Sequence, residues 1–361
     1  MRNARRLVLL AIPVLLPFTA CDNASRPVER ADAAAVRDTT PPGPPPWTPK
    51  PIVAPPAPDS AGASADSSDV PADSTVSRTR RRFRAMVLTP ADSARWPVQG
   101  PAPLPGALLP EHRIVAYYGN IQSTRMGILG QIPRDQMLAR LEETAMEWAQ
   151  ADPGRKVMPA LHLITTVAQG KPGAGGKYRL RMGDSLINEV ARWAEERGWI
   201  MFLDVQIGHS TVEAELQPLV PFLARPYVHL ALDPEFAMTR GGVPGRRIGT
   251  LDATHVNYAI GLLAGLVDSL RLPPKVLVVH RFTRRMLTNH DRIRLDPRVQ
   301  VVIQMDGFGS PVHKQDAYKF FIVPEPVQFT GFKLFYKNDK PIMKPEEVIG
   351  LWPSPVYVQY Q

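Results

Sequence analysis

The residues with the clearest chemical potential in this chain are two acids, Asp233 and Glu235, that follow a short apolar stretch. In the preceding segment, 227–232, large apolar residues occupy every second position, which predicts a β-strand. If this alternation continues through Pro234, both carboxyl groups leave the strand on the same side, with Cα atoms roughly 6–7 Å apart. Carboxyl groups this close can shift each other's pKa and act as general acid and base. The alternative is a turn that begins at Asp233 and leaves Glu235 in solvent.

Seven further segments of the chain predict strands, and helical segments alternate with all eight. The expected strands cover residues 113–119, 157–166, 199–206, 227–232, 276–280, 299–304, 331–336 and 356–359. The expected helices cover residues 134–149, 184–197, 211–223, 252–270, 283–294, 312–321 and 344–350. Eight strands alternating with helices over about 250 residues predict an α/β fold, a (β/α)8 TIM-like barrel spanning 111–361. An open doubly wound sheet is the competing architecture.

Polar residues stand at or near the carboxyl ends of these strands, where the active site of such a barrel is built. The predicted catalytic residues are Glu235 as acid, Asp233 as its partner, and Asp204 and Asp306 as assisting carboxylates. The predicted substrate-binding residues are Tyr117, Tyr118, His162, Gln206, His209, His280, Gln304, Lys333, Tyr336 and Gln359. Asp204 and Gln206 are two positions apart, as are Gln304 and Asp306, so each pair should share one face of its strand.

Three chemistries fit this set of residues. The first is glycoside hydrolysis, which uses a carboxylic acid of raised pKa and a second carboxylate. The second is metal-assisted hydrolysis, for which the candidate ligands are His162, His209, His280, Asp306 and Asp204. The third is binding of a glycan or peptide without turnover. Because the chain has neither a His-Glu-x-x-His motif nor a Gly-x-Gly-x-x-Gly after the first strand, we expect no organic cofactor, and a metal only under the second chemistry.

Three short motifs resemble known enzyme families. The segment 114–118 (Ile-Val-Ala-Tyr-Tyr) resembles the first strand of chitinase-type glycoside hydrolases. Leu232-Asp233-Pro234-Glu235 resembles the fourth-strand Asp-x-Glu of those enzymes and of the N,O-diacetylmuramidase-type lysozymes, and 358–360 (Val-Gln-Tyr) resembles the closing Trp-Gln-Tyr strand of these lysozymes. The resemblance implies a sugar-hydrolase-like barrel. Since the seventh strand carries no carboxylate before Asp339, a substrate-assisted or single-site mechanism is expected if the domain is a hydrolase.

The first 21 residues are typical of an exported, lipid-anchored protein. Residues 1–6 are basic, residues 7–18 are apolar but too short to span a bilayer, and small residues precede Cys21. This pattern resembles the lipobox of bacterial lipoproteins, in which the cysteine is lipidated, and the chain as a whole resembles lipoproteins of uncharacterised activity. The sequence therefore predicts a signal peptide at 1–20 and anchoring of the protein to a bacterial membrane in the cell envelope. Cys21 is the chain's only cysteine, which excludes an intramolecular disulfide.

The composition of residues 21–110 predicts a disordered linker that contributes no side chains to the hydrophobic core. Their segment 22–110 holds 18 of the chain's 39 prolines and few large apolar residues. Five arginines lie within 78–84, a cluster that is either a solvated part of the linker or a contact for anionic lipid or polymer. The region 111–361 contains 30 Lys and Arg against 25 Asp and Glu, without a basic face interleaved with aromatics. We therefore expect no nucleic-acid partner, and a glycan or cell-wall polymer instead.

Overall fold

The structure, a computed structural model, describes residues 47–55 and 89–361. The proposed signal peptide 1–20, the proposed lipidation site Cys21 and the basic cluster 78–84 lie outside the described residues. Most of the proposed linker also lies outside them, so the expectations for these segments remain predictions.

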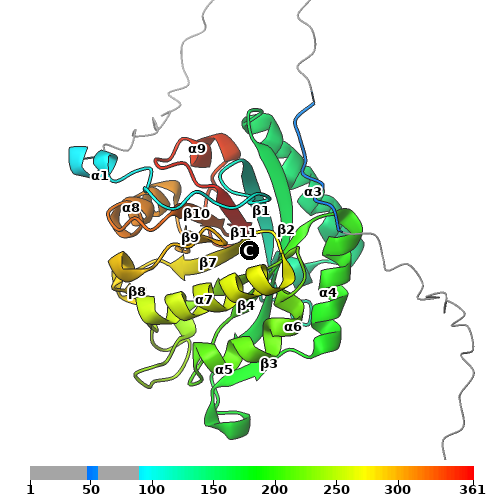
Figure 1. Ribbon diagram of the computed structural model, residues 1–361, viewed down its shortest axis with the longest axis vertical. Helices are drawn as coiled ribbons and strands as arrows, with labels where there is room; N and C mark the ends of the chain where they lie inside the picture. Colours follow the sequence, from blue (N-terminus) through cyan, green and yellow to red (C-terminus); the bar gives the residue numbers. More distant parts are fainter. Residues whose placement is uncertain (1–46, 56–88) are drawn as a thin grey trace, which may run out of the picture. The chain divides into compact units, whose positions relative to one another are not determined.

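Eight parallel strands of the described region close into a barrel (Figure 1). The strands are β1 (His112–Gly119), β2 (Lys156–Ala168), β4 (Ile200–Val205), β5 (Val228–Leu232), β7 (Lys275–Arg281), β9 (Val299–Met305), β10 (Phe329–Leu334) and β11 (Tyr357–Tyr360). They follow one another around the barrel in chain order, and β1 closes it by pairing with both β2 and β11. The TIM-like architecture predicted from the sequence is confirmed, and the open sheet is excluded by this closure.

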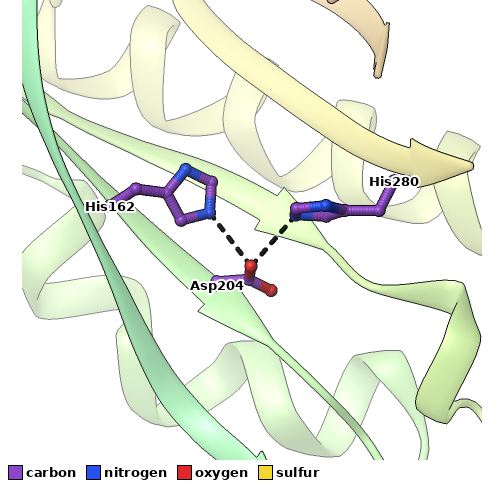
Figure 2. Close-up of side chains that lie close together, drawn as sticks. All are labelled: His162, Asp204 and His280. Carbon is purple, nitrogen blue, oxygen red and sulfur yellow. Dashed lines mark hydrogen bonds and ion pairs between the residues drawn. The ribbon is translucent and has the colours of Figure 1, made fainter. Parts of the chain in front are cut away.

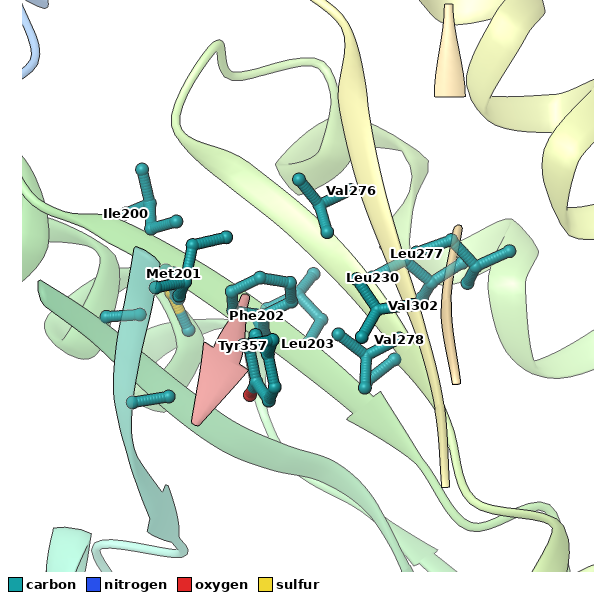
Figure 3. Packing of buried hydrophobic residues seen from close by; sticks show 14 of the residues in the cluster. Ile200, Met201, Phe202, Leu203, Leu230, Val276, Leu277, Val278, Val302 and Tyr357 are labelled. Carbon is teal, nitrogen blue, oxygen red and sulfur yellow. The ribbon is translucent and has the colours of Figure 1, made fainter. Parts of the chain in front are cut away.

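The barrel strands are buried on both faces, because each strand is covered by helices outside and by other strands' side chains inside. All six residues of β4 are buried, as are all five of β5 and all seven of β7. Figure 3 shows part of this packing, with Phe202 of β4 against Tyr357 of β11, whose ring centroids are 5.3 Å apart. The interior is therefore filled by side chains and is not a channel.

Helices surround the barrel on its outer side. They are α3 (Arg134–Ala151), α4 (Asp184–Arg197), α5 (Val212–Leu216), α6 (Val220–Leu223), α7 (Ala253–Leu270), α8 (Pro311–Phe321) and α9 (Pro345–Ile349), with the short α1 (Pro90–Ala94) and α2 (Ile128–Gln131). The predicted end of α4 is confirmed, since Gly198 follows it in the left-handed conformation at φ 67°. Among the described residues, none of the helices has the length and hydropathy needed to cross a bilayer.

Two of the expected helices differ from the structure. The segment 211–223 is broken into α5, a 3-10 turn at Gln217–Leu219 and α6, since Pro218 and Pro221 interrupt its regular hydrogen bonds. The segment 283–294 contains 3-10 turns and the two-residue strand β8 (Leu287–Thr288), which pairs with β6 (Leu251–Asp252). Asn289, in the left-handed conformation at φ 53°, prevents a continuous helix there.

Parts of the proposed linker pack against the barrel, which corrects the expectation that residues 21–110 contribute no core. Ile52 forms a bridge with Val157 at the start of β2. Trp96 is buried and its indole Nε1 donates to the carbonyl oxygen of Val323 at 3.0 Å. Leu109 is 1% exposed, and the side-chain amide of Gln300 on β9 accepts from its backbone N–H and donates to its carbonyl oxygen. These apolar residues are isolated among prolines, so no periodicity in the sequence revealed them.

Candidate functional site

A cavity of about 640 Å³ opens at the carboxyl end of the barrel strands. Six of the predicted site residues line it: Tyr118, Gln206, Asp233, Glu235, Asp306 and Lys333. Residues that the sequence analysis did not single out complete its wall, among them Arg125, Phe236, Phe282, Phe308, Phe335 and Asn338. The cavity therefore combines three carboxyl groups and an ammonium with an aromatic wall.

Asp233 and Glu235 lie in a turn and not in an extension of the strand. β5 ends at Leu232, and Pro234–Phe236 forms a 3-10 turn. Asp233 caps this turn, because its Oδ1 accepts the backbone N–H of Glu235 at 3.0 Å. Its other oxygen, Oδ2, accepts from the side-chain amide of Gln206 at 3.2 Å. The expected alternation through Pro234 is thus wrong, yet both carboxyl groups still line the same cavity.

Both acids hold their protons more tightly than ordinary carboxyl groups do. Burial raises the pKa of Asp233 to about 8; the positive charge of His280 opposes this shift, and the negative charges of Asp204, Glu235 and Asp306 add to it. Burial also raises the pKa of Glu235, helped by the nearby charge of Asp306. Glu235 is half-buried while Asp233 is 3% exposed, so Glu235 is the acid that a bound ligand meets first.

Beneath the cavity, Asp204 of β4 joins two histidines in the barrel interior. The Nε2 atoms of His162 and His280 each lie 3.0 Å from Asp204 Oδ2. Figure 2 shows the two rings on either side of Asp204, with both contacts converging on one carboxylate oxygen. All three side chains are fully buried. The other oxygen of Asp204, Oδ1, has no hydrogen-bond partner among the described residues.

His162 is neutral in this arrangement. Its Nδ1 lies 2.6 Å from the Tyr357 hydroxyl and 3.0 Å from the amide nitrogen of Gln359. Because an amide N–H only donates, Nδ1 accepts, and the ring proton sits on Nε2 and points to Asp204. Burial lowers the pKa of His162 to about 4, despite the hydrogen bond to Asp204.

His280 is positively charged, because each of its ring nitrogens faces a carboxylate. Its Nδ1 lies 2.9 Å from Asp306 Oδ2, opposite the contact with Asp204. Burial alone would lower the pKa of His280, but the charge of Asp204 and the hydrogen bonds to Asp204 and Asp306 raise it to about 10. Burial likewise opposes ionisation of Asp204, but the charge of His280 and the hydrogen bonds from both histidines lower its pKa below the ordinary range.

Lys333 completes the group of charges. Its Nζ lies 3.0 Å from Asp306 Oδ1 and 3.9 Å from the centre of the Tyr118 ring. Burial opposes ionisation of Asp306, but Lys333 and His280 outweigh burial and lower its pKa. The series Asp204, His280, Asp306 and Lys333 therefore alternates in charge and sums to zero. Such a series stabilises ionised groups that would be costly to bury singly.

The donor atoms of His162, Asp204 and His280 also suit a metal ion. One atom from each lies within 4.8 Å of the other two, and imidazole nitrogen with carboxylate oxygen is a donor set that zinc accepts. The Nδ1 atoms of both rings are held by further groups, as in metal centres where a carboxylate orients a histidine. A metal would replace the two Nε2 protons and leave His280 neutral.

Eight predicted site residues do not line the cavity, among them Asp204, which lies beneath it. The Tyr117 hydroxyl lies 2.7 Å from Thr144 Oγ1 and 3.0 Å from the Tyr336 hydroxyl, so both tyrosines lie on the α3 side of β1. His209 stacks on Tyr178, and its Nε2 lies 2.6 Å from the carbonyl oxygen of Gly242. His162, His280, Gln304 and Gln359 lie below the cavity and not at its rim.

Tyr357 is a site residue that sequence reasoning missed. It contacts His162 directly and also lies 3.1 Å from the amide nitrogen of Gln359. Tyr357 and Gln359 are two positions apart on β11, so they share one face of that strand. The same spacing rule that paired Asp204 with Gln206 would therefore have identified Tyr357.

Compared with known proteins, the chain matches no protein family and no curated sequence.

Proposed function

We propose that the barrel is a glycan hydrolase in which Glu235 is the general acid. One observation carries the proposal: two carboxyl groups of raised pKa, Asp233 and Glu235, line one cavity at the carboxyl end of the barrel. A carboxylic acid of raised pKa can protonate the oxygen of a leaving sugar. The resemblance of 232–235 to the Asp-x-Glu of chitinase-type enzymes agrees with this role.

The carboxyl groups around Glu235 have separate roles in the proposed mechanism. Asp233 fixes the turn that carries Glu235, and in its neutral form it adds no charge next to the acid. Asp306 is ionised and lines the same cavity, so it supplies negative charge near the oxocarbenium-like centre that develops on the sugar. Once Glu235 has given up its proton, its carboxylate can take a proton from the water that completes hydrolysis.

The aromatic wall supports a sugar ligand. Tyr118, Phe282 and Phe335 line the cavity together with the exposed Phe308, whose side chain belongs to the loop after β9. Aromatic side chains offer flat apolar surfaces to the C–H faces of sugar rings, while a few polar groups fix the orientation. Asn338 and Arg125 can bind hydroxyl or acidic substituents at the outer edge.

The decisive experiment compares the parent protein with Glu235→Gln on peptidoglycan, chitin and plant glycans, measured by release of reducing ends. The amide keeps the shape but cannot donate the acid proton, so the rate should fall by about 10²–10⁴-fold with binding largely retained. Glu142→Gln, an exposed change on α3, is the matched control and should keep full activity. Parent activity that Glu235→Gln leaves intact would refute the role of this residue.

Absence of turnover in the parent would favour a different function, a barrel that binds glycans without cleaving them. In that case Glu235→Gln and Asp233→Asn should weaken glycan binding measured by calorimetry. The same panel of glycans therefore separates a hydrolase from a binding protein.

A metal-dependent hydrolase is the second candidate, favoured by the convergence of His162, Asp204 and His280. The three side chains would hold the ion, which would activate a water molecule when bound. Metal analysis of the purified protein, with melting temperature before and after chelator, tests it. A metal-free protein whose melting temperature ignores chelator removes this candidate.

We further propose that Cys21 is lipidated and anchors the protein in the cell envelope. The support comes from the sequence alone, since residues 1–21 lie outside the described region. Cys21→Ser should move the protein from the membrane fraction to the soluble fraction. Continued fractionation of this variant with membranes at high salt would show that another part of the chain provides the anchor.

A further inference from the structure

A second cavity of about 510 Å³ lies beside the first and is lined by four arginines, Arg240, Arg247, Arg284 and Arg285. None of its lining residues is acidic. The two cavities share the same segments of chain: Phe236 and Phe282 line the first, and the residues that follow each of them, Ala237 and Thr283, line the second. The arginine-lined cavity is therefore next to the proposed catalytic cavity.

Three of these arginines have no anionic partner in the described part of the protein. No hydrogen bond or ion pair holds the guanidinium groups of Arg240, Arg247 or Arg285, and all three side chains are exposed. Arg284 differs, because its Nε lies 3.4 Å from Glu325 Oε1 and its guanidinium contacts the carbonyl oxygen of Phe320. Like charges gathered without counter-charges repel one another, and a bound anion would relieve that repulsion.

The loop that carries two of the arginines is fixed to the catalytic turn. The backbone N–H of Gly249 donates to the carbonyl oxygen of Glu235 at 2.6 Å, and that of Thr250 donates to Ala237 at 3.1 Å. A Cβ atom at Gly249 would lie 2.5 Å from the carbonyl oxygen of Pro234, so only glycine permits this close approach. The position of Arg247, two residues before Gly249, is thereby tied to that of Glu235.

We propose that the arginine-lined cavity binds phosphate or carboxylate groups, and that these groups belong to an acidic glycan that extends from the first cavity. The guanidinium group suits both anions because its fork of N–H groups matches their oxygen pairs. Anion binding follows from the cavity itself. The assignment to the substrate rests on the proposed hydrolase function, since it places one polymer across both cavities.

Binding is tested by calorimetry with two probes, inorganic pyrophosphate and a tetrameric oligouronate, which separate the phosphate and carboxylate sources. The double variant Arg247→Gln/Arg285→Gln should weaken binding of at least one probe about tenfold or more, because charged hydrogen bonds are lost. Raising the salt concentration should weaken parent binding as well, since the arginines are exposed. Arg246→Gln, an exposed arginine of the same loop that does not line the cavity, is the matched control and should bind like the parent.

Arg247→Lys/Arg285→Lys keeps the charge but loses the fork, so its affinity should lie between that of the parent and that of the glutamine variant. No binding of either probe to the parent would overturn the proposal. Equal losses in Arg246→Gln and the double variant would also overturn it, because the effect would then be one of general surface charge.

Glu235→Gln separates this inference from the function on which its substrate assignment rests. This variant should bind pyrophosphate like the parent, whatever its activity, because Glu235 does not line the arginine-lined cavity. If the parent is a hydrolase, the double variant should raise KM for acidic glycans and leave KM for neutral glycans unchanged. Equal KM changes for acidic and neutral glycans would refute the assignment to substrate, while loss of probe binding in the double variant would still support the anion site.

Discussion

The interior of the barrel and the arginine-lined cavity differ in whether their charged side chains have counter-charges within the chain. In the interior, Asp204, His280, Asp306 and Lys333 alternate in sign, and each ionised group contacts an opposite charge within 3.0 Å. In the cavity, Arg240, Arg247 and Arg285 gather without a counter-charge among the described residues. Each interior charge therefore has its counter-charge within the chain, whereas the anion proposed for the cavity would come from outside.

This difference separates charges that support the site from charges that meet a ligand. A buried charge is tolerated only when its partner is built into the fold, since desolvation is costly. An exposed guanidinium remains hydrated, so leaving it without a counter-charge costs little free energy when no ligand is bound. Asp233 and Glu235 lie between these extremes: burial raises the pKa of both carboxyl groups, and they line a cavity that a ligand can enter.

The largest expected effect comes from breaking the interior series. Asp204→Asn removes the charge between the two histidines and should lower the free energy of unfolding by about 3–5 kcal/mol, measured by chemical denaturation. Asp291→Asn, at an exposed position, should change it by less than about 0.5 kcal/mol. A loss of under 1 kcal/mol in Asp204→Asn would show that the series is not needed for stability.

An apolar substitution with a similar expected loss of stability serves as the comparison for Asp204→Asn. Leu109→Ala removes a fully buried side chain from the segment before β1 and should cost about 2–5 kcal/mol. Because it alters no ionisable group, its cost should be the same at pH 5 and pH 8. The same comparison tests the correction to the linker: an unchanged stability would mean that residues 89–110 add nothing to the core.

A smaller, pH-dependent effect is expected for Asp233. The unfolded chain releases this proton near pH 4, whereas the folded protein keeps it up to about pH 8, so its contribution to stability falls as pH rises between these values. Asp233→Asn removes that dependence. The stability of the variant relative to the parent should therefore be at least about 1 kcal/mol more favourable at pH 8 than at pH 5. A difference that does not change with pH would show that Asp233 is ionised in the folded protein.

The smallest effect on stability should come from the cavity arginines. Arg247→Gln/Arg285→Gln should leave the free energy of unfolding within about 0.5 kcal/mol of the parent in the absence of an anion. Pyrophosphate at saturating concentration should raise the melting temperature of the parent but not that of the variant. A large stability loss without ligand would mean that these side chains are structural, and the contrast with the interior would disappear.

Much of the fold could be predicted because the barrel strands are apolar runs bounded by turn residues. The expected strand at 113–119 matches β1 to within one residue, and the expected helix at 184–197 matches α4 at both ends. The segment 211–223 was predicted wrongly because its apolar spacing was given more weight than Pro218 and Pro221. Trp96 could not be predicted, since its partners lie more than 200 positions away.

For the candidate site, the two-residue spacing along each strand predicted which strand face a residue occupies. It did not predict whether the side chain lies at the cavity or deeper in the barrel. Asp204 and Gln206 share a face of their strand, yet Asp204 is sealed in the interior while Gln206 reaches the cavity two positions later. Depth depends on how far each strand is displaced along the barrel axis relative to its neighbours, which local sequence does not encode. The arginine-lined cavity was missed for a related reason: 240–247 and 284–285 are brought together only by the fold.

The closure of the barrel by β1 has a consequence for its synthesis. Ile114 pairs with Tyr357, which is 243 positions further along the chain. At synthesis rates of about 5–20 residues per second, one edge of β1 waits on the order of 12–50 s for its partner strand. His162 acquires its Tyr357 and Gln359 contacts only at that moment. A nascent chain therefore cannot complete its barrel until β11 has been synthesised.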